Sequence, residues 1–356
     1  MPMRTRIRIA ALQAVCVLAS IEPLRAFLLS ASLRRGPLPT AEAWRATAVR
    51  LPRLGGMRAL RSANDAPMRP QKVAVIGGGP AGLATALALQ KLPTGVKSVT
   101  VFERKANLRP GVGGGIQING GAAILSKLGL RDEILAAGNP LERVLARNVD
   151  GTTLLDIQVP DLIRGLAPKP PVLRLIDMAA EARKQLVGDD GKISVFLIMR
   201  DKLQEMLAGS LPAGTVKFNK ALTSVTETLD GQQVVCKFAD GEEEAFDLVV
   251  GCDGVKSLVR EQICGPDSAI YSGVRILFAV APHSSGPGGS RAPEIQQQVH
   301  QWFGDGAYTF TASYGGPKGD KYDQIAIITA DSQVTPENAE WTSSDRRSEM
   351  LRYANV

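Results

Sequence analysis

The chain has 356 residues and is 44% hydrophobic, which is enough for one large or two modest domains with a packed core. Its formal net charge of +7 comes from residues 1–69, which hold 12 arginines, no lysine and three acidic residues, whereas the remainder holds 30 basic and 32 acidic residues. The charge of the folded part therefore gives no reason to expect a nucleic-acid partner.

Residues 1–69 have the order of a targeting leader. Three arginines precede an uncharged, mostly apolar run at residues 9–21, which is too short for a comfortable membrane span, and an acid-poor stretch containing arginine and serine follows Phe27. This order resembles a signal peptide followed by a transit peptide. We expect an organelle, with the plastid favoured and the mitochondrion or the secretory pathway as alternatives, and no stable membrane span in the mature chain. A folded N-terminal helix is the structural alternative.

Residues 72–103 contain the pattern around which the chain is organised. The β-branched run at residues 72–76 predicts a buried parallel strand, and the alanine-rich run at residues 81–92 predicts a helix that ends before Pro93. A second strand is expected at residues 98–102. A strand, a glycine turn, a helix and a strand within about thirty residues are typical of a dinucleotide-binding unit.

The glycines of this unit, spaced G-x-G-x-x-G, have separate physical roles. Gly77 permits a tight turn, Gly79 lets the backbone approach a pyrophosphate, and Gly82 lets the helix pack closely on the strand. The start of the helix offers unpaired N–H groups and the positive end of its dipole to phosphates. Glu103, at the end of the second strand, can accept hydrogen bonds from ribose hydroxyls.

The segments that follow alternate between helices and short strands. Four glycines within residues 109–119 predict a flexible loop, and residues 120–138 carry apolar positions at helical spacing. Asp150-Gly151 predicts a hairpin turn within residues 141–159, and a helix is expected at residues 178–187.

The second half of the chain is rich in predicted strands. A strand at residues 193–198 precedes a helix that begins at Arg200, and another helix is expected after Asp253-Gly254. Asp-Gly pairs separate three strand-like runs, which predict an antiparallel meander at residues 215–229, 232–239 and 244–250. Alternating runs then predict an antiparallel sheet at residues 270–281, 295–303, 307–314 and 324–329.

Cysteines and histidines form no catalytic or metal-binding pattern. The four cysteines fit neither a metal site nor a disulfide framework, and Cys252 is interpreted as a buried small residue. His283 and His300 have no partner at triad or metal-ligand spacing, so we expect them to have surface or packing roles.

Three stretches resemble the single-component FAD-dependent aromatic hydroxylases, a monooxygenase family that includes para-hydroxybenzoate hydroxylase and, more distantly, zeaxanthin epoxidase. The stretches are Gly77-Gly78-Gly79-Pro80-Ala81-Gly82 with Glu103-Arg104, Gly113-Gly114-Gly115-Ile116-Gln117-Ile118-Asn119, and Asp253-Gly254-x-x-Ser257-x-x-Arg260. The third stretch distinguishes this family from other flavoproteins. The resemblance covers residues 71–273 well and the remainder loosely.

The resemblance implies a cofactor site, with no catalytic side chain and no metal. Arg200 takes the place of the family's arginine near the FAD phosphates, Gln117 lies in the loop near the isoalloxazine ring, and Asp253 lies near the FAD. The cofactor-binding residues that we expect are Gly77, Gly79, Pro80, Ala81, Gly82, Glu103, Arg104, Gly115, Gln117, Arg200, Asp253 and Gly254.

The implied activity is that of an FAD- and NAD(P)H-dependent monooxygenase. Such an enzyme inserts one oxygen atom from O2 into an apolar, ring-containing substrate through a flavin hydroperoxide. Because one nucleotide fingerprint is present, NAD(P)H would bind transiently rather than in a domain of its own. The alternatives are a non-catalytic FAD-binding fragment and a prenyl-chain reductase of the same fold.

The implied fold class is α/β. A Rossmann-like FAD-binding domain with a three-stranded antiparallel meander is expected at residues 70–142 and 193–268, and a second, mainly antiparallel β substrate domain at residues 143–192 and 269–356. The family's third motif, a Gly-Asp string after the substrate sheet, has no match, since Gly304-Asp305-Gly306 reads as a hairpin turn. We therefore expect a chain truncated at its C-terminus.

Overall fold

The computed structural model describes residues 70–108, 113–164, 186–187, 191–192, 194–266, 274–283, 297–304, 307–317 and 321–330. The leader at residues 1–69, most of the helix expected at residues 178–187 and the stretch after Ala330 lie outside the described residues. The described residues from Gln71 onward belong to one compact unit, and the finer domain boundaries remain a prediction. Among the described helices, none is long and apolar enough to cross a membrane.

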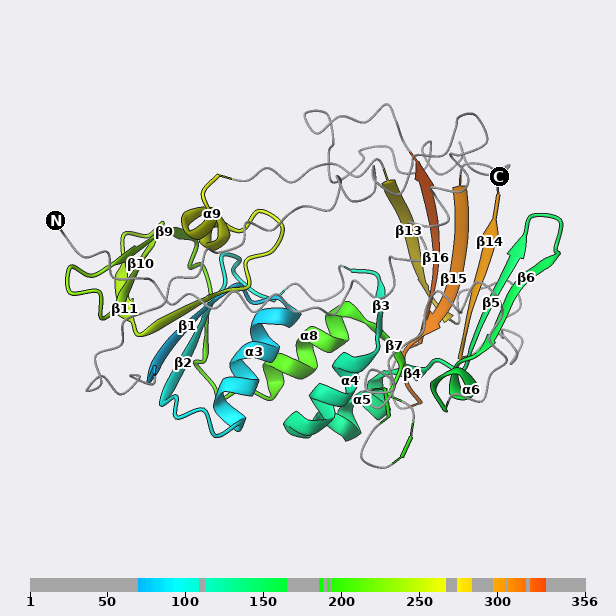
Figure 1. Cartoon of the computed structure of the whole chain (residues 1–356), viewed down its shortest axis with the longest axis horizontal. Coiled ribbons are helices and arrows are strands. Elements are labelled where there is room, and N and C mark those ends of the chain that lie inside the picture. Colours follow the sequence, from blue (N-terminus) through cyan, green and yellow to red (C-terminus); the bar gives the residue numbers. More distant parts are fainter. Residues whose placement is uncertain are drawn as a thin grey trace, which may run out of the picture. The chain divides into compact units, whose positions relative to one another are not determined.

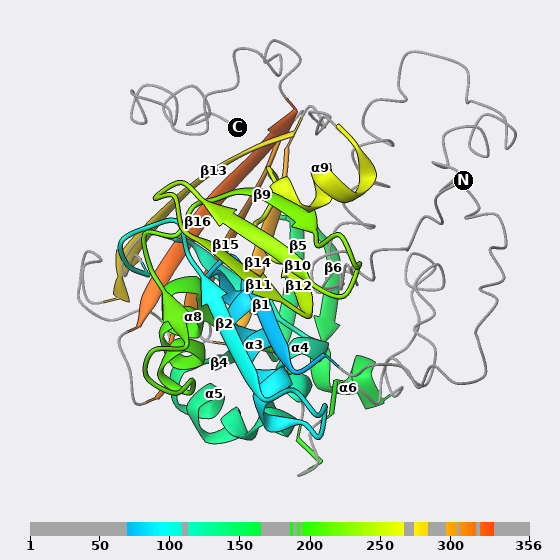
Figure 2. The ribbon, with the colours of Figure 1, turned by 90° about the vertical axis from the view of Figure 1, so that its left-hand side faces the viewer.

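A four-stranded parallel sheet has the order β12-β1-β2-β8. Figure 2 labels β12, β1 and β2 of this sheet. Its strands are β1 (Lys72–Ile76), β2 (Ser98–Phe102), β8 (Val216–Lys217) and β12 (Leu248–Gly251). Ile76 lies opposite both Phe102 and Gly251, so these three strands end at the same edge of the sheet. The strand, helix and strand expected over residues 72–103 are confirmed, with α3 at Pro80–Lys91.

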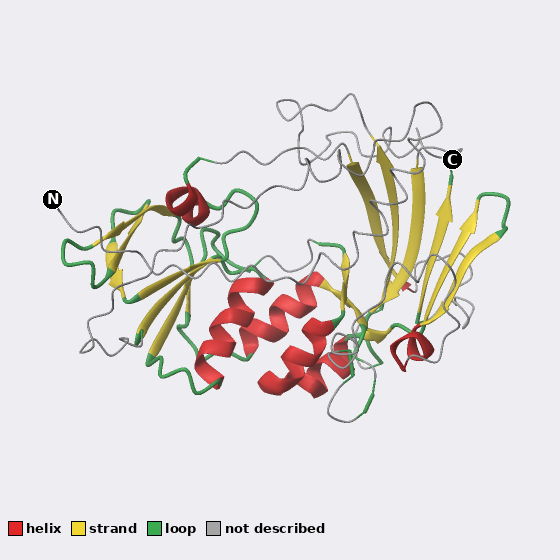
Figure 3. Ribbon diagram, viewed as in Figure 1, coloured by secondary structure: helices red, strands yellow, loops and turns green. Residues whose placement is uncertain are grey.

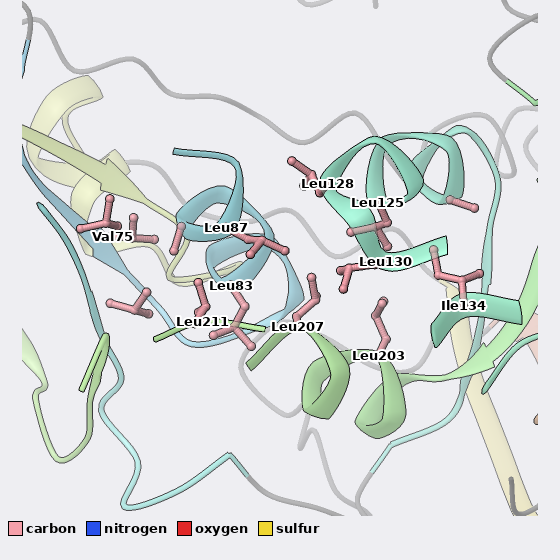
Figure 4. Close-up of a cluster of buried hydrophobic side chains, with 14 of the residues drawn as sticks. Val75, Leu83, Leu87, Leu125, Leu128, Leu130, Ile134, Leu203, Leu207 and Leu211 are labelled. Carbon is pink, nitrogen blue, oxygen red and sulfur yellow. The ribbon is translucent and has the colours of Figure 1, made fainter. Parts of the chain in front are cut away.

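Helix α3 packs on one side of this sheet, and further helices lie beyond α3 (Figure 1). They are α4 (Gly120–Leu125), the π-helical turn η3 (Ser126–Leu130), α5 (Arg131–Ala137) and α8 (Arg200–Gly209). Leucines of α3, η3 and α8 share one buried cluster with Val75 of the sheet (Figure 4). Fully burying one such side chain contributes about 1.5–3 kcal/mol. The helical spacing of the apolar residues predicted helices within residues 120–138, and packing of buried leucines holds α3 and α8 beside each other.

A small sheet in the order β3-β7-β4 packs against these helices. Its strands are β3 (Gly115–Ile118), β7 (Phe196–Met199) and β4 (Asn139–Pro140). The prediction of a flexible loop over residues 109–119 is therefore wrong for its second half. Ile116 and Ile118 alternate and pack against the helical core, and the backbone of β3 pairs antiparallel with β7.

The meander consists of β9 (Leu222–Glu227), β10 (Val234–Phe238) and β11 (Glu243–Phe246), as expected for its three antiparallel strands. Two of the predicted runs each divide in two: residues 215–229 form β8 and β9, and residues 244–250 form β11 and β12. The second division falls at Asp247, whose Oδ2 accepts hydrogen bonds from the backbone N–H groups of Gln71 and Lys72 at 2.8 and 2.9 Å. These bonds tie Asp247 to the start of β1, so the chain leaves the meander at this residue and continues in the parallel sheet as β12.

A six-stranded sheet has the order β13-β16-β15-β14-β5-β6 (Figure 3). Its strands are β5 (Arg143–Asn148), β6 (Thr153–Gln158), β13 (Val274–Pro282), β14 (Gln298–Phe303), β15 (Ala307–Tyr314) and β16 (Tyr322–Ala330). All neighbours pair antiparallel except β14 and β5. The predicted α/β fold class, with a mainly antiparallel second sheet, is confirmed. Two short helices, α6 (Val159–Arg164) and α9 (Leu258–Cys264), complete the described elements.

Candidate functional site

The glycine turn after β1 lies at the carboxyl edge of the parallel sheet. Gly77 has φ +111°, and its N–H donates to the carbonyl of Phe102 at 2.8 Å. A Cβ on Gly77 would lie 2.3 Å from the carbonyl oxygen of Cys252, and a Cβ on Gly82 would lie 1.9 Å from the carbonyl oxygen of Gly77. The tight turn thus requires Gly77, and the close approach of α3 to the end of β1 requires Gly82, as the sequence predicted.

Gly79 differs from these two glycines because nothing crowds it. A Cβ built on Gly79 meets no atom within 4 Å, and its φ of −74° and ψ of 174° are accessible to any residue. Gly79 is the N-cap of α3, no side chain caps this helix, and Pro80 fills its first turn without contributing an N–H group. The uncapped helix start beside free space suits a pyrophosphate, since both the N–H groups of the first turn and the helix dipole favour an anion there.

Glu103 orders the same turn from the end of β2. Its Oε2 accepts a hydrogen bond from the N–H of Gly78 at 2.8 Å, and its Oε1 accepts one from the N–H of Lys105 at 3.0 Å. A carboxylate has about four acceptor positions, so it can also receive ribose hydroxyls. Arg104 is exposed beside it. The ribose contact itself remains a prediction.

Gln204 is a residue of this site that the sequence reasoning missed. It lies on α8, is only 8% exposed, and donates from Nε2 to the carbonyl oxygen of Gly78 at 2.6 Å. A glutamine in a helix is ordinarily taken for a solvent-facing residue. The available signal was its spacing: Gln204 precedes the buried Leu207 by three residues and therefore shares the buried face of α8.

Arg200 begins α8, one turn before Gln204 and on the same face. Arg200 is exposed, and its backbone N–H donates to the carbonyl of Gly114 at 3.3 Å. A Cβ built on Gly113 would lie 3.5 Å from the Cβ of Arg200. The helix thus brings the predicted arginine and the second glycine-rich stretch together. A role of Arg200 toward phosphates is compatible with this placement and remains a prediction.

Gly115 joins β3 to the six-stranded sheet. Its N–H donates to Oε1 of Gln324 at 2.6 Å, and a Cβ on it would lie 2.1 Å from the ring of Tyr314. Burial raises the pKa of the Tyr314 hydroxyl, which therefore stays protonated at neutral pH. Gln117, two residues further along β3, is exposed and donates from Nε2 to Asn119 Oδ1 at 2.9 Å.

Asp253 follows β12, with Gly254 at φ +87° completing the turn, and its carboxylate holds the start of α9. Its Oδ1 accepts a hydrogen bond from Ser257 Oγ at 2.5 Å, and its Oδ2 accepts one from the N–H of Leu258 at 2.8 Å. Ser257 caps α9 by accepting from the N–H of Arg260 at 3.0 Å. The Asp253 side chain of the D-G motif thus fixes the first turn of α9 in this structure. Its predicted position near the FAD remains a prediction.

Replacing Asp253 by alanine is expected to lower the free energy of unfolding by about 1–2 kcal/mol, the usual effect of losing a helix-capping acceptor. Asp253→Asn retains an acceptor oxygen and should lose less. Urea unfolding of the protein without added FAD measures both values. An alanine variant as stable as the wild type would contradict the anchoring role.

The cysteine and histidines singled out in the sequence have local partners. Cys252 is half-buried rather than buried; burial raises the pKa of its thiol, whose Sγ lies 3.9 Å from Thr85 Oγ1. His283 Nδ1 lies 3.1 Å from Asp323 Oδ2, and the ring of His300 stacks on Trp302 with centroids 5.8 Å apart. These contacts are consistent with packing roles.

The glycine turn, the uncapped helix and the acid at the end of β2 define the class of the molecule: a dinucleotide-binding α/β protein with an attached antiparallel sheet. The family model for the FAD binding domain matches residues 71–287, and the chain belongs to this family. The resemblance that the sequence motifs indicated is thereby confirmed.

Proteins of known activity and structure are similar to the chain over part of their length. The salicylate hydroxylase asL1 of Sarocladium schorii is 31% identical over 205 residues, which cover 56% of this chain and 38% of that protein. The 3-amino-4-hydroxybenzoate 2-monooxygenase of Streptomyces cremeus is 29% identical over 265 residues, covering 74% and 59%. Klebsiella pneumoniae HpxO complexed with FAD and uric acid shares the fold, with TM-score 0.58, 19% identity and coverage of 80% and 62%. The chain spans less than two thirds of each of these proteins.

Proposed function

We propose that this chain is the FAD-binding part of an FAD- and NAD(P)H-dependent monooxygenase. The observation that carries the proposal is the uncapped start of α3 beside the free space at Gly79, at the same sheet edge as Glu103. Membership of the FAD binding domain family and the names of the similar proteins support it. When bound, FAD supplies the redox chemistry by which one oxygen atom of O2 is transferred to a substrate at the expense of NAD(P)H.

The residues of the chain have binding and orienting roles in this proposal. The backbone N–H groups of Gly79, Ala81 and Gly82 receive the pyrophosphate. Glu103 receives the adenosine ribose, and its negative charge disfavours a 2′-phosphate. Arg200 lies next to the second glycine-rich stretch, where its charge can offset that of the phosphates. No described side chain is required to act as an acid, base or nucleophile.

The six-stranded sheet supplies a surface suited to a small aromatic or apolar substrate. Gln324 and Phe278 lie close to the second glycine-rich stretch. A Cβ built on Gly114 would lie 2.8 Å from Oε1 of Gln324 and 3.2 Å from the ring of Phe278. Strand pairing places the exposed side chains of Ile276 and Phe278 on the same face as Gln324, whereas Ala326 and Ile328 on that face are buried. The similar proteins are named for aromatic acids, which are small and carry an apolar ring.

The direct test measures three properties of the purified protein: bound FAD by its visible absorbance, oxidation of NADH or NADPH, and oxygenation of hydroxybenzoates with O2 consumption. We expect bound FAD and an NAD(P)H oxidation rate that rises with an aromatic acid. A protein that retains FAD but oxidises no NAD(P)H would favour the non-catalytic alternative, and FAD-dependent reduction of a prenyl chain without O2 would favour the reductase. Absence of FAD binding would overturn the whole proposal.

We also propose that residues 1–69 direct the protein to an organelle, with the plastid favoured. The support is the arginine-rich, acid-poor composition and the short apolar run at residues 9–21. N-terminal sequencing of the protein isolated from its source should find a start near residue 70. A mature protein that begins at Met1 and resists protease in this segment would contradict the proposal.

A further inference from the structure

We propose that Gln204 is a positioning residue for the cofactor: its amide fixes the peptide between Gly78 and Gly79 so that the N–H of Gly79 faces the pyrophosphate. The inference rests on the proposed FAD site and adds a residue that lies outside the glycine motif. Gln204 is 126 residues away from Gly78 in sequence, and α8 brings it to the turn.

Gly78 is held on both sides of its α-carbon. Its N–H donates to Oε2 of Glu103 at 2.8 Å, and its carbonyl oxygen accepts from Nε2 of Gln204 at 2.6 Å. The second of these bonds is buried. The two side chains come from β2 and α8, so elements on either side of the turn determine the orientation of one glycine.

The orientation of the carbonyl of Gly78 decides where the N–H of Gly79 points. The peptide bond is trans, as are all those described, and in a trans peptide the C=O and the N–H point in opposite directions. Because Gln204 holds the carbonyl toward α8, the N–H of Gly79 points away from α8. Gly79 itself borders the free space at the start of α3, where an anion is expected.

A Gly-Gly peptide needs such a restraint more than others. Glycine occupies positive and negative φ with similar ease, so the plane between Gly78 and Gly79 can rotate at little steric cost. A flipped peptide would present the carbonyl oxygen of Gly78, rather than the N–H of Gly79, to the phosphates. The partial negative charge of the carbonyl oxygen would repel the phosphates, whereas the N–H attracts them. The affinity for the cofactor would therefore fall.

Two substitutions separate this role from simple packing. Gln204→Leu removes the donor and keeps a side chain that fills the space. Gln204→Glu keeps the shape but cannot donate while ionised, and it regains a donor O–H when protonated. Burial raises the pKa of a carboxyl, so protonation should occur at mildly acidic pH. The charged groups of the elements that meet here are Glu103 after β2, Lys91 on α3, and Arg200, Asp201, Lys202 and Glu205 on α8. All of them are present in the wild type, whose pH profile accounts for them.

The experiment measures dissociation constants of FAD, and of ADP as a pyrophosphate probe, by fluorescence and calorimetry at pH 8 and pH 5.5, with urea unfolding of each protein without ligand. We expect about a tenfold weaker binding of both ligands to Gln204→Leu at either pH, in line with the loss of one buried hydrogen bond. Gln204→Glu should bind more weakly still at pH 8 and recover at pH 5.5 relative to wild type. Glu205→Leu, on the exposed side of the same helix, is the matched control and should bind as the wild type does.

Three outcomes would overturn the inference. Wild-type affinity in both variants would show that the amide does not orient the turn. Weaker binding without recovery of Gln204→Glu at pH 5.5 would show a packing role only. If the wild type itself binds neither FAD nor ADP, the proposed function fails and the inference with it; if the wild type binds and the variants do not differ from it, the inference alone fails.

Discussion

Replacing Gly79 by aspartate is expected to weaken FAD binding at least 100-fold while leaving the protein without FAD as stable as the wild type or more so. Aspartate is a favourable N-cap residue, and the φ and ψ of Gly79 suit a capping side chain. Its carboxylate would occupy the N–H groups of the first turn of α3, and its charge would repel the pyrophosphate. A 100-fold loss corresponds to about 2.7 kcal/mol.

Gly79→Asn is the matched control for charge, because asparagine has nearly the same shape and also caps helices. It should weaken binding less than Gly79→Asp does, and the difference between the two should shrink at high salt. Calorimetric titration with FAD and urea unfolding measure the two effects separately. Full FAD binding by Gly79→Asp would place the pyrophosphate elsewhere.

Replacing Gly82 by alanine is expected to destabilise the fold by about 3 kcal/mol or more, because the added Cβ would lie 1.9 Å from the carbonyl oxygen of Gly77. The helix α3 would have to move away from β1, and the buried contacts of Leu83 and Leu87 would loosen with it. FAD binding should then fall as a consequence of unfolding.

Gly79→Ala is the control for Gly82→Ala, since it makes the same chemical change three residues away at a position where the Cβ meets nothing within 4 Å. It should change the free energy of unfolding by less than about 1 kcal/mol. Thermal or urea unfolding of the two variants without FAD provides the comparison. Equal stabilities would mean that α3 can shift without loss of packing.

The two groups of predictions distinguish glycines that build the turn from the glycine that leaves room for a ligand. Sequence spacing identified all three glycines of the motif but gave each a role by analogy with the motif as a whole. The structure assigns Gly77 and Gly82 to close contacts within the protein, and it leaves Gly79 beside free space. Similarly, the D-G motif indicated the family, whereas its hydrogen bonds showed that Asp253 anchors α9.

Local pattern was sufficient to predict the elements that carry strong periodicity. The β-branched runs became β1 and β2, the alanine-rich run became α3, and the alternating runs with Asp-Gly turns became antiparallel strands. These features depend on side-chain spacing and turn chemistry, which are properties of neighbouring residues. The predicted family followed from the same local motifs and their order.

Contacts between distant segments were decided by the tertiary structure. The strand β3 lies in a glycine-rich stretch and forms by pairing with β7. Asp247 divides the strand-like run at residues 244–250 by binding the start of β1. Gln204 became part of the site because α8 packs against α3 and carries its amide to Gly78. Hydrogen bonds of this kind join residues more than a hundred positions apart, and no local pattern records which partner a buried polar group will find.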